Sequence, residues 1–526
     1  MGWNRFHLLL GVVYLACLAL ATYLAGRKRQ SENQYLNATG SMPLWVCILA
    51  SVAANCGSLD VTAMMALGAQ YGMVVCHFYW IGAVPALLLL IFWLLPAYAQ
   101  RRYISVLDFI ARAYGRPTRT AVALCVAIMM LLLAGVCLSA AAQVMQTFLG
   151  WDFTRSILVM GALVLAFTWV GGLRATVYVE LLHFAVVLIA VAPLVFLVVR
   201  GFGGFSHFYA SIPADRAHLW QTLPVFAPAA AMDRLGLIFG LGVVLSFGYW
   251  STDFVLVQRA LAVRRASDVP FVPLTQAVAK ILFAFLIVLP GVAAPLVLGA
   301  GKTAWNATLP AMMLHYYSPA WAALSCAGLL ACLISTYANN ISGFSAAWVE
   351  GIDRPLMRAE GGQSQSLWAG RLTNAAAVLL SMGAAWLAVH YQSLMEYIQL
   401  IFSIFNAPLL ALVLLAALVP KRAARGGLAG LLLGMVCAAA HQILAHLGWL
   451  RFGSQINANF YSSMLGFTVA AAGALVAGAW RGAEPIGSAE PMQPIALTFP
   501  KRRRAATLLA ALGIAAACIA LNVIFR

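Results

Sequence analysis

Long apolar stretches recur along almost the whole chain, separated by short polar segments. Most of them run for about 20 residues, the length at which a helix crosses roughly 30 Å of hydrocarbon. Because lipid offers no partners for open backbone hydrogen-bonding groups, such stretches must be helical. The alternating pattern of barrel strands is absent from the sequence. The chain is therefore predicted to be an all-α membrane protein.

Fourteen transmembrane helices are predicted from this pattern. The first is followed directly by three basic residues and lacks a convincing cleavage site, so we interpret it as a retained span. The predicted spans are 7–26, 44–71, 75–98, 120–149, 154–171, 174–199, 235–260, 270–299, 320–350, 368–390, 394–419, 427–449, 461–480 and 504–525.

The basic residues of the loops define an orientation. With the N-terminus outside, the loops on the inner side carry 23 of the 32 Lys and Arg residues, and those on the outer side carry 8. Cytoplasmic loops are normally the basic ones, so both termini are predicted to face out. The stretch 101–118 fits either a short surface helix or a plain cytoplasmic loop, and 481–503 resembles a flexible linker.

Composition supports a membrane protein. Hydrophobic residues make up 63% and charged residues only 9%, whereas soluble domains carry about 25% charged residues. The net charge of +17 does not indicate nucleic-acid binding, because the basic residues lie in short loops without a platform. The bilayer is thus an expected partner, and nucleic acid is not. Ten scattered cysteines without a CxxC pair suit small core positions, and no metal cluster, nucleophile triad or carboxylate pair predicts an enzyme or a cofactor.

Two predicted helices are interrupted by small polar residues at mid-membrane. The first interruption runs from Ala54 to Ser58 and is followed by Asp60, and the second runs from Gly248 to Asp253. Non-helical backbone at that depth is tolerated only where it is buried in protein or lines a cavity. Broken helices at corresponding places in two halves indicate a transporter with its site near the midplane.

Each interruption opens a block of five spans, so the two blocks must insert with opposite orientation. Two unrelated kinks are the alternative. We expect a five-plus-five inverted repeat in four parts. These are an N-terminal extra helix (1–42), the first repeat (43–200), the second repeat (234–420) and C-terminal extra helices (421–526).

The sequence over about 40–425 resembles the sodium:solute symporter family, which includes bacterial proline, galactose and sialic acid transporters. Four stretches in order carry the resemblance. They are Trp169 to Ala175 with Glu180; Tyr249 and Trp250 followed by Gln258 to Ala262; Lys280 followed by Leu289 to Gly291; and Ile334 to Thr336 followed by Glu350 and Asp353. The resemblance implies a fold like that of LeuT and sodium as the coupling ion.

The resemblance also implies a sodium site where the first broken helix meets the eighth core helix. Oxygen ligands suit a hard cation. The adjacent hydroxyl pair of the family falls on Ser335 and Thr336, and its carbonyl donors fall on Ala54, Gly57 and Cys332. Glu180 stands where the family usually has aspartate, and we expect it and Asn339 to support the ion site. For Ser335 and Thr336 the alternative role is a hydroxyl bonded to the carbonyl of the preceding turn.

The same resemblance places a solute beside the two interruptions. The matched positions predicted to bind it are Asp60, Tyr79, Ser246, Asp253, Lys280 and Gln399. Lys280 has a purely structural alternative, in which it pairs with Asp60 or Asp253. His77, Trp80 and Tyr249 are predicted to line or gate the cavity, with core packing as the alternative.

The sequence thus predicts a sodium-coupled symporter of a bacterial inner membrane that imports a small polar solute by alternating access. A sugar, a sugar acid, an amino acid or a carboxylate remain open as the solute. Proton coupling through Asp60, Glu180 or Asp253, uncoupled transport, and a sensor on the same fold are the alternatives. The last span, 504–525, lies beyond the matched core and has no role assigned from the sequence.

Overall fold

A computed structural model describes most of the chain. The described residues are 42–95, 106–171, 176–220, 223–252, 257, 259–260, 262–301, 303–353, 363–419, 425–480 and 501–526. Within them every regular element is helical, and the only strand-like feature is an isolated bridge between Met42 and Val263. The predicted all-α class is therefore confirmed.

Three groups of helices follow one another along the chain. The first part of the chain holds α3 (Leu44–Asn55), α4 (Ser58–Tyr71), η1 (Gly72–Cys76), α5 (His77–Trp80), α6 (Val84–Leu89), η2 (Leu90–Leu94), α8 (Val106–Tyr114), α9 (Arg116–Leu149), α10 (Phe153–Gly171), α11 (Thr176–Gly201), α12 (Phe205–Ser211) and α13 (Ala214–Ala217). The middle part holds η4 (Gly236–Leu245), α14 (Ser246–Thr252), η5 (Ala266–Asp268), α16 (Phe271–Phe283), η6 (Ala284–Val288), α17 (Leu289–Leu298), η7 (Trp305–Ala307) and α18 (Thr308–Tyr316). The last part holds α19 (Pro319–Trp348), η8 (Val349–Asp353), α21 (Gln363–Ala388), α22 (Leu394–Ile401), η9 (Phe402–Asn406), α23 (Ala407–Leu418), α25 (Gly427–His446), α26 (Gln455–Trp480) and α27 (Lys501–Ile524).

Nine helical stretches in the described part of the chain are long and apolar enough to cross a membrane. Four shorter apolar helices coincide with further predicted spans. The predicted span 7–26 lies outside the described residues, so the count of fourteen stays a prediction. The inverted repeat likewise stays a prediction.

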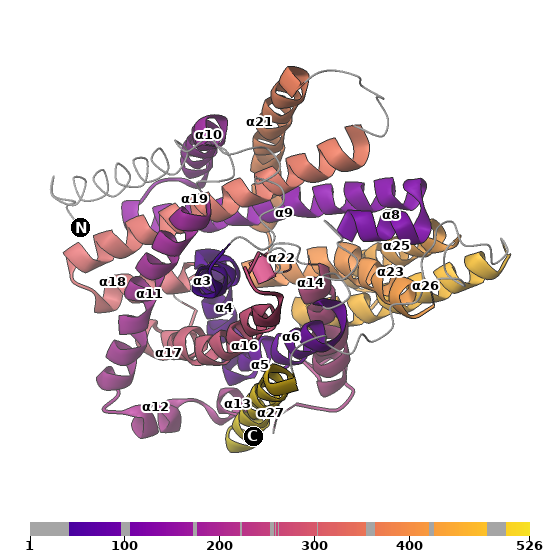
Figure 1. Cartoon of the computed structure of the whole chain (residues 1–526). Coiled ribbons are helices and arrows are strands. Elements are labelled where there is room, and N and C mark those ends of the chain that lie inside the picture. Colours follow the sequence, from indigo (N-terminus) through magenta and orange to yellow (C-terminus); the bar gives the residue numbers. More distant parts are fainter. Residues whose placement is uncertain are drawn as a thin grey trace.

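The broken pair α3 and α4 lies in the middle of the molecule, enclosed by the longer helices (Figure 1). Helices α9 and α19 pack side by side along one flank, with α21 against α9. Helices α16 and α17 cover another side of α3 and α4. This arrangement places the interruption of the first broken helix inside the protein, as its backbone requires.

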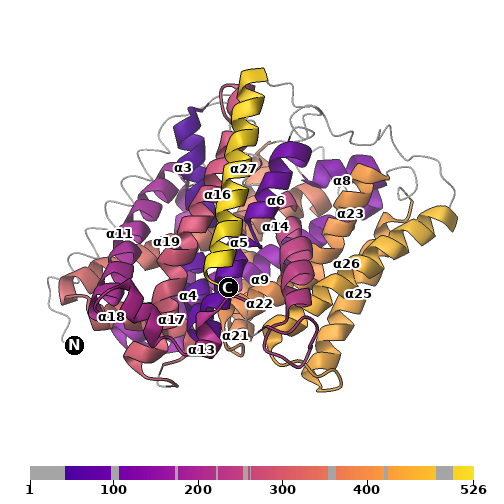
Figure 2. The same ribbon diagram turned by 90° about the horizontal axis from the view of Figure 1, so that it is seen from below.

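Helices α25 and α26 form a tightly packed pair at one edge (Figure 2). Gly430 and Gly434 of α25 are four residues apart and face Ala470 and Ala474 of α26. A Cβ at Gly430 would lie 2.5 Å from the Ala470 carbonyl oxygen and 2.6 Å from the Ala474 Cβ. Small residues at this spacing let two membrane helices approach until their backbones touch.

The stretch 101–118 contains the helix α8, as one of the two interpretations predicted. Its apolar face is buried against the protein and includes Phe109 and Ile110. The Tyr114 hydroxyl donates to the Leu412 carbonyl at 2.7 Å, which joins α8 to α23. The opposite face carries the pair of Arg112 and Asp108, 3.1 Å apart.

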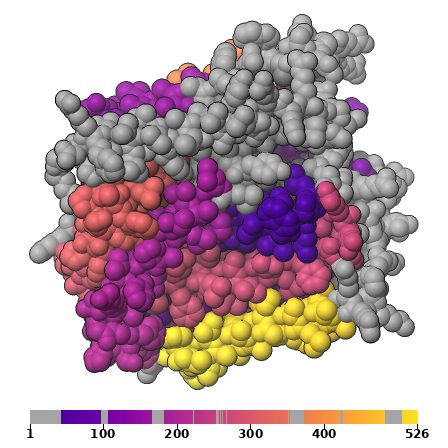
Figure 3. Space-filling model, turned by 60° about the vertical axis from the view of Figure 1, so that its left-hand side comes forward, coloured from indigo at the N-terminus to yellow at the C-terminus, as the bar shows by residue number. Residues whose placement is uncertain are grey.

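The last helix, α27, lies along α16 and α6 (Figure 3). Near its end the Asn522 side-chain oxygen accepts a hydrogen bond from the Trp220 indole at 2.9 Å. The Leu219 amide donates to the Phe525 carbonyl at 3.0 Å. Helix α27 is therefore fastened to the segment that follows α13, although its outer surface remains apolar and exposed at Leu509 and Ile519.

Replacement of Gly430 by Val should destabilise the protein. The new side chain would collide with backbone atoms of α26, and overpacking of this kind costs about 1–3 kcal/mol. The purified protein should lose a few degrees in Tm. The control is Gly513→Val in α27, since nothing lies within 4 Å of a Cβ at that position. Equal Tm values for the two variants would contradict the tight α25–α26 contact.

Candidate functional site

The first broken helix is interrupted where the sequence predicts it. Helix α3 ends at Asn55 and α4 begins at Ser58. The Cys56 amide still donates to the Val52 carbonyl at 2.9 Å, but Gly57 is extended, with ψ at 179°. Only two residues separate the end of α3 from the start of α4. The last carbonyls of α3 and the first amides of α4 lack hydrogen-bond partners within their own helices.

Helix α19 packs directly on this interruption. The Ser58 amide donates to the Cys332 Sγ at 3.2 Å, and the Ser58 hydroxyl donates to the Leu329 carbonyl at 3.2 Å. A Cβ at Gly57 would lie 3.5 Å from the Cys332 Sγ and 3.7 Å from the Thr336 Oγ1. Gly57, Cys332 and Thr336, which were predicted to share a sodium site, are thus neighbours in the structure.

Of the two hydroxyl groups of Ser335 and Thr336, only that of Thr336 has a described hydrogen bond. The Thr336 hydroxyl donates to the Cys332 carbonyl at 3.0 Å, which is the alternative role considered from the sequence. Among the described residues the Ser335 hydroxyl has no hydrogen-bond partner, although the residue is only 4% exposed. An unmet buried hydroxyl costs about 1–3 kcal/mol, and a cation is a suitable partner for its oxygen. The oxygen donors at this place fit sodium, which the chain would carry as a transported ion.

The Ala53 carbonyl oxygen is a further candidate ligand for sodium, and it was not predicted from the sequence. It lies 3.7 Å from the same Gly57 Cβ position that is 3.7 Å from the Thr336 Oγ1. The predicted donor Gly57 already accepts a hydrogen bond from the Val61 amide at 3.1 Å. The signal was available, because the last four carbonyls of any helix lack partners within that helix, and Ala53 and Ala54 both belong to that set in α3.

Lys280 of α16 bridges the interruption from the other side. Its Nζ donates to the Asn55 carbonyl at 2.6 Å and forms an ion pair with Asp60 at 3.2 Å. The Tyr79 hydroxyl donates to the same carboxylate oxygen at 3.1 Å, and the Lys280 Nζ stands 5.0 Å over the Tyr79 ring. The lysine therefore closes the end of α3 and neutralises the first acidic residue of α4. Its pairing with Asp60 matches the structural alternative.

Tyr249 of α14 reaches the same region. Its hydroxyl donates to the Asn55 side-chain oxygen at 2.8 Å, and its ring lies 5.6 Å from that of Phe402 in η9. Ser246, the first residue of α14, is buried nearby on the same short helix. Asn55 was not among the predicted site residues, yet both its carbonyl and its side chain join the helices around the interruption.

Two buried glutamines have amide oxygens without a hydrogen-bond partner among the described residues. The Nε2 of Gln399 in α22 lies 3.7 Å from the Met395 sulfur, and its Oε1 is one of these two oxygens. Gln276 lies one turn before Lys280 and is 0% exposed. Its Nε2 is 3.8 Å from the Cys56 Sγ, and its Oε1 has no partner. Gln399 was predicted from the resemblance, whereas Gln276 was missed.

The structure does not bring His77 and Trp80 into this cluster through any described contact. His77 is 3.3 Å from the Leu219 carbonyl and stacks at 4.1 Å on Trp220. Trp80 is fully buried against Phe285. Both side chains make the core contacts that were the alternative to lining or gating the cavity.

Three predicted site residues have less structural information. Asp253 lies outside the described residues. Glu180 belongs to α11, but its side chain is not among the described ones. Asn339 is half-buried on α19, one turn beyond Ser335.

The second interruption differs from the prediction over its first residues. Gly248 to Thr252 are helical in α14. The Thr252 hydroxyl donates to the Gly248 carbonyl at 2.6 Å, and this side-chain bond supports the helix end. The irregular part described for this span is the π-helical η4, which begins at Gly236, twelve residues before Gly248. Residues 253–256 lie outside the described part.

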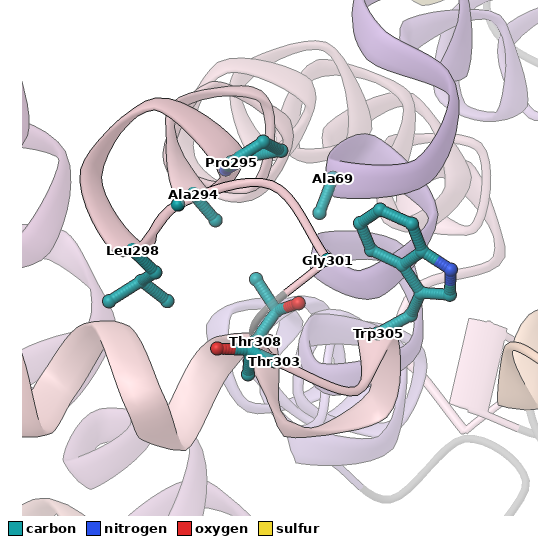
Figure 4. A pocket seen from close by; sticks show the side chains of 9 residues that line it. Ala69, Ala294, Pro295, Leu298, Gly301, Thr303, Trp305 and Thr308 are labelled. Carbon is teal, nitrogen blue, oxygen red and sulfur yellow. The ribbon is translucent and has the colours of Figure 1, made fainter.

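A small cavity lies near the end of α4, apart from the interruption (Figure 4). Ala69, Pro295, Trp305 and Thr308 are among its lining residues. Its volume is about 10 Å³, room for about one water molecule. It lies eleven residues beyond Ser58 on α4, so it is separate from the cluster around Lys280.

An apolar helical protein with a helix broken beside oxygen donors and a buried ion pair has the architecture of secondary transporters. The sodium:solute symporter family matches residues 35–434. This range covers well over half of the sequence, so the chain belongs to the sodium:solute symporter family. Members of this family are transporters and not enzymes, as the sequence predicted.

Relatives with assigned functions carry sugars and polyols. The sodium/glucose cotransporter 1 of Ovis aries is 24% identical over 457 residues, which cover 79% of this chain and 68% of the relative. The sodium/myo-inositol cotransporter 2 of Mus musculus is 24% identical over 82% of this chain and 69% of its own. The sodium/glucose cotransporter of Vibrio parahaemolyticus is 20% identical over 77% of this chain and 78% of its own.

Solved structures share the fold. A Na+-coupled sialic acid symporter in a substrate-bound outward-open state superposes with a TM-score of 0.73 at 17% identity, covering 90% of this chain and 98% of that one. Mhp1, a nucleobase-cation-symport-1 family transporter, superposes with a TM-score of 0.52 at 12% identity, covering 84% and 93%.

Replacement of both Ser335 and Thr336 by Ala should abolish the effects of sodium. The double variant loses the two hydroxyl oxygens beside the interruption, and a hard cation has no substitute there. Sodium should no longer raise the Tm of the purified protein or stimulate uptake. The control is Ser345→Ala on the same helix, whose hydroxyl bonds Asn374 instead. An undiminished sodium response in the double variant would refute the site.

Replacement of Lys280 by Met should destabilise the protein by about 1–3 kcal/mol, because it leaves the Asn55 carbonyl without its donor and the Asp60 carboxylate without its counter-charge. The double change K280M/D60N removes the unpaired charge and should recover part of the lost Tm. Thermal unfolding in detergent measures both. If the double variant is no more stable than K280M, the ion pair is not what holds the two helix ends.

Proposed function

We propose that the chain is a sodium-coupled symporter that imports a small neutral polyhydroxylated solute, a sugar or a polyol, by alternating access. The observation that carries the proposal is the charge balance beside the interruption. The only described cation there, Lys280, is already paired with Asp60. Among the described residues, the amide oxygens of Gln276, near Cys56, and of Gln399, three residues before Phe402, have no donors. Hydroxyl groups are the donors that such acceptors need.

The same balance disfavours an acidic solute. A carboxylate brings acceptors and a negative charge, and it would compete with Asp60 for the one lysine of the cluster. Desolvating a charge without its own partner costs several kcal/mol. Sugar acids, amino acids and carboxylates therefore fit this site less well than sugars and polyols. The printed names of the relatives, which include glucose and myo-inositol, support the same class.

Sodium couples to the solute through the interruption between α3 and α4. Bound between Ala53, Cys332, Ser335 and Thr336, the ion would hold the end of α3 against α19. The end of α3 carries Asn55, which Lys280 and Tyr249 contact from the solute side. Ion and solute thus share one helix end, and each stabilises the geometry that the other needs.

The sodium gradient can drive a large accumulation of the solute inside the cell. One sodium ion moving down ~100 mV provides ~2.3 kcal/mol. A tenfold sodium gradient adds ~1.4 kcal/mol. At one-to-one coupling this supports roughly 500-fold accumulation of a neutral solute.

The distribution of Lys and Arg supports an orientation with both termini outside, and we place the protein in a bacterial inner membrane.

The solute class can be tested by thermal unfolding of the purified protein in sodium and again in potassium. D-Glucose, D-galactose, D-mannose and myo-inositol form one panel, and sialic acid, L-proline and succinate form the other. We expect stabilisation by a member of the first panel in sodium only. Stabilisation only by the acidic or zwitterionic panel would overturn the charge argument. Equal stabilisation in both salts would indicate proton-coupled or uncoupled transport.

A matched variant tests the residue that binds the solute. Gln399→Leu keeps the volume of the side chain and removes the free amide oxygen. The solute should need a much higher concentration to raise the Tm of the variant, while sodium alone should stabilise the variant as it does the parent protein. An unchanged half-saturating solute concentration in Gln399→Leu would exclude this side chain from the site.

A further inference from the structure

A network of buried amides joins α25 and α26. The Gln442 Nε2 donates to the Asn459 Oδ1 at 3.0 Å, and the Gln455 Nε2 donates to the same oxygen at 3.0 Å. The Gln455 Nε2 also lies 3.1 Å from the Gln442 Oε1. Asn459 is 0% exposed. The three amide side chains are hydrogen-bond partners of one another, and a connected network of this kind favours one arrangement.

The network ends on α22 and η9, on both sides of Gln399. The Asn459 Nδ2 donates to the Glu396 carbonyl at 2.8 Å, three residues before Gln399. The Gln442 Nε2 lies 3.4 Å from the Ser403 hydroxyl, four residues after it. The helix that presents Gln399 is thus held one turn before and one turn after this side chain by two helices that follow it in the sequence.

The other side of α22 is held by the first broken helix. The Glu396 side chain accepts hydrogen bonds from the Tyr71 hydroxyl at 2.7 Å and from the Gln70 amide at 3.1 Å. Glu396 therefore joins α4 through its carboxylate and α26 through its carbonyl. The segment η9 that follows is π-helical, a form that is frequent at functional sites. The position of α22 depends on these side-chain contacts as well as on its own helical bonds.

We propose that Asn459 and Gln442 are positioning residues that orient Gln399 for the solute. Helices α25 and α26 then act on solute affinity, although they lie outside the five-plus-five core predicted from the sequence. The solute part of this inference rests on the proposed function. The orientation of position 399 by the network does not, because it concerns only contacts within the protein.

The first test measures the surroundings of position 399 without any solute. A cysteine is placed there (Gln399→Cys), and its labelling rate by a charged methanethiosulfonate reagent is compared with the parent protein, which corrects for the native cysteines. Addition of Asn459→Leu should change that rate at least threefold. The control is Thr468→Val on the same helix α26, whose exposed hydroxyl bonds only the Met464 and Leu465 carbonyls. It should leave the rate unchanged.

If Asn459→Leu does not fold, the variant Asn459→Asp takes its place in the labelling experiment. It keeps the oxygen that accepts from Gln442 and Gln455 and removes the donor to the Glu396 carbonyl. A changed labelling rate in Asn459→Asp supports the proposal. An unchanged rate in both Asn459 variants, or an equal change in Thr468→Val, overturns it.

The second test uses a double-mutant cycle with D-glucose and myo-inositol as probes. Asn459→Leu should raise the half-saturating probe concentration about 3- to 10-fold in otherwise unchanged protein, and should add nothing in the Gln399→Leu background. Stabilisation by sodium alone should not change. Additive effects would show that Asn459 does not act through Gln399. If neither probe affects the parent protein, the proposed solute class fails while the labelling result still decides the positioning role.

Discussion

The interruption between α3 and α4 is the constraint on which the rest of the structure depends. Two helix ends meet inside an apolar protein, and their free amides and carbonyls must find partners there. The protein supplies them from three directions. The thiol of Cys332 accepts from the Ser58 amide, Lys280 donates to the Asn55 carbonyl, and Tyr249 donates to the Asn55 side chain. Each partner comes from a different helix, so the break organises α19, α16 and α14 around one point.

The two sides of the interruption differ in charge and in how many of their polar groups are hydrogen-bonded. On the α16 side, Lys280, Asp60 and Tyr79 form a closed and neutral set of contacts. On the α19 side, the Ser335 hydroxyl has no partner among the described residues, and the neighbouring Thr336 Oγ1 lies close to Gly57. In the proposed function a cation uses the hydroxyl oxygens on this side, and a neutral solute uses the amide oxygens of Gln276 and Gln399.

Much of this could be predicted from the sequence, because the evidence is local. Apolar length predicts spans, small polar residues predict the break at Ala54 to Ser58, and the family motifs place Ser335, Thr336, Lys280 and Gln399. The misses have a common cause. Gln276, Asn55 and Asn459 are ordinary polar residues in their own helices, and only the contacts of other helices give them a role. Of the second predicted interruption, Gly248 to Thr252 are helical instead, and the Thr252 hydroxyl donates to the Gly248 carbonyl.

The sequence by itself determined the class of the protein, the helical character of its described spans and the place of the first break. These follow from the length of apolar runs and from the chemistry of residues near one another in the chain. The tertiary structure decided which partner Lys280 takes, that His77 and Trp80 pack toward Trp220 and Phe285, and that α25 and α26 hold the helix carrying Gln399. Hydrogen bonds across helices depend on how those helices are packed, and residues more than 50 positions apart, such as Asn459 and Glu396, show no such relation along the chain.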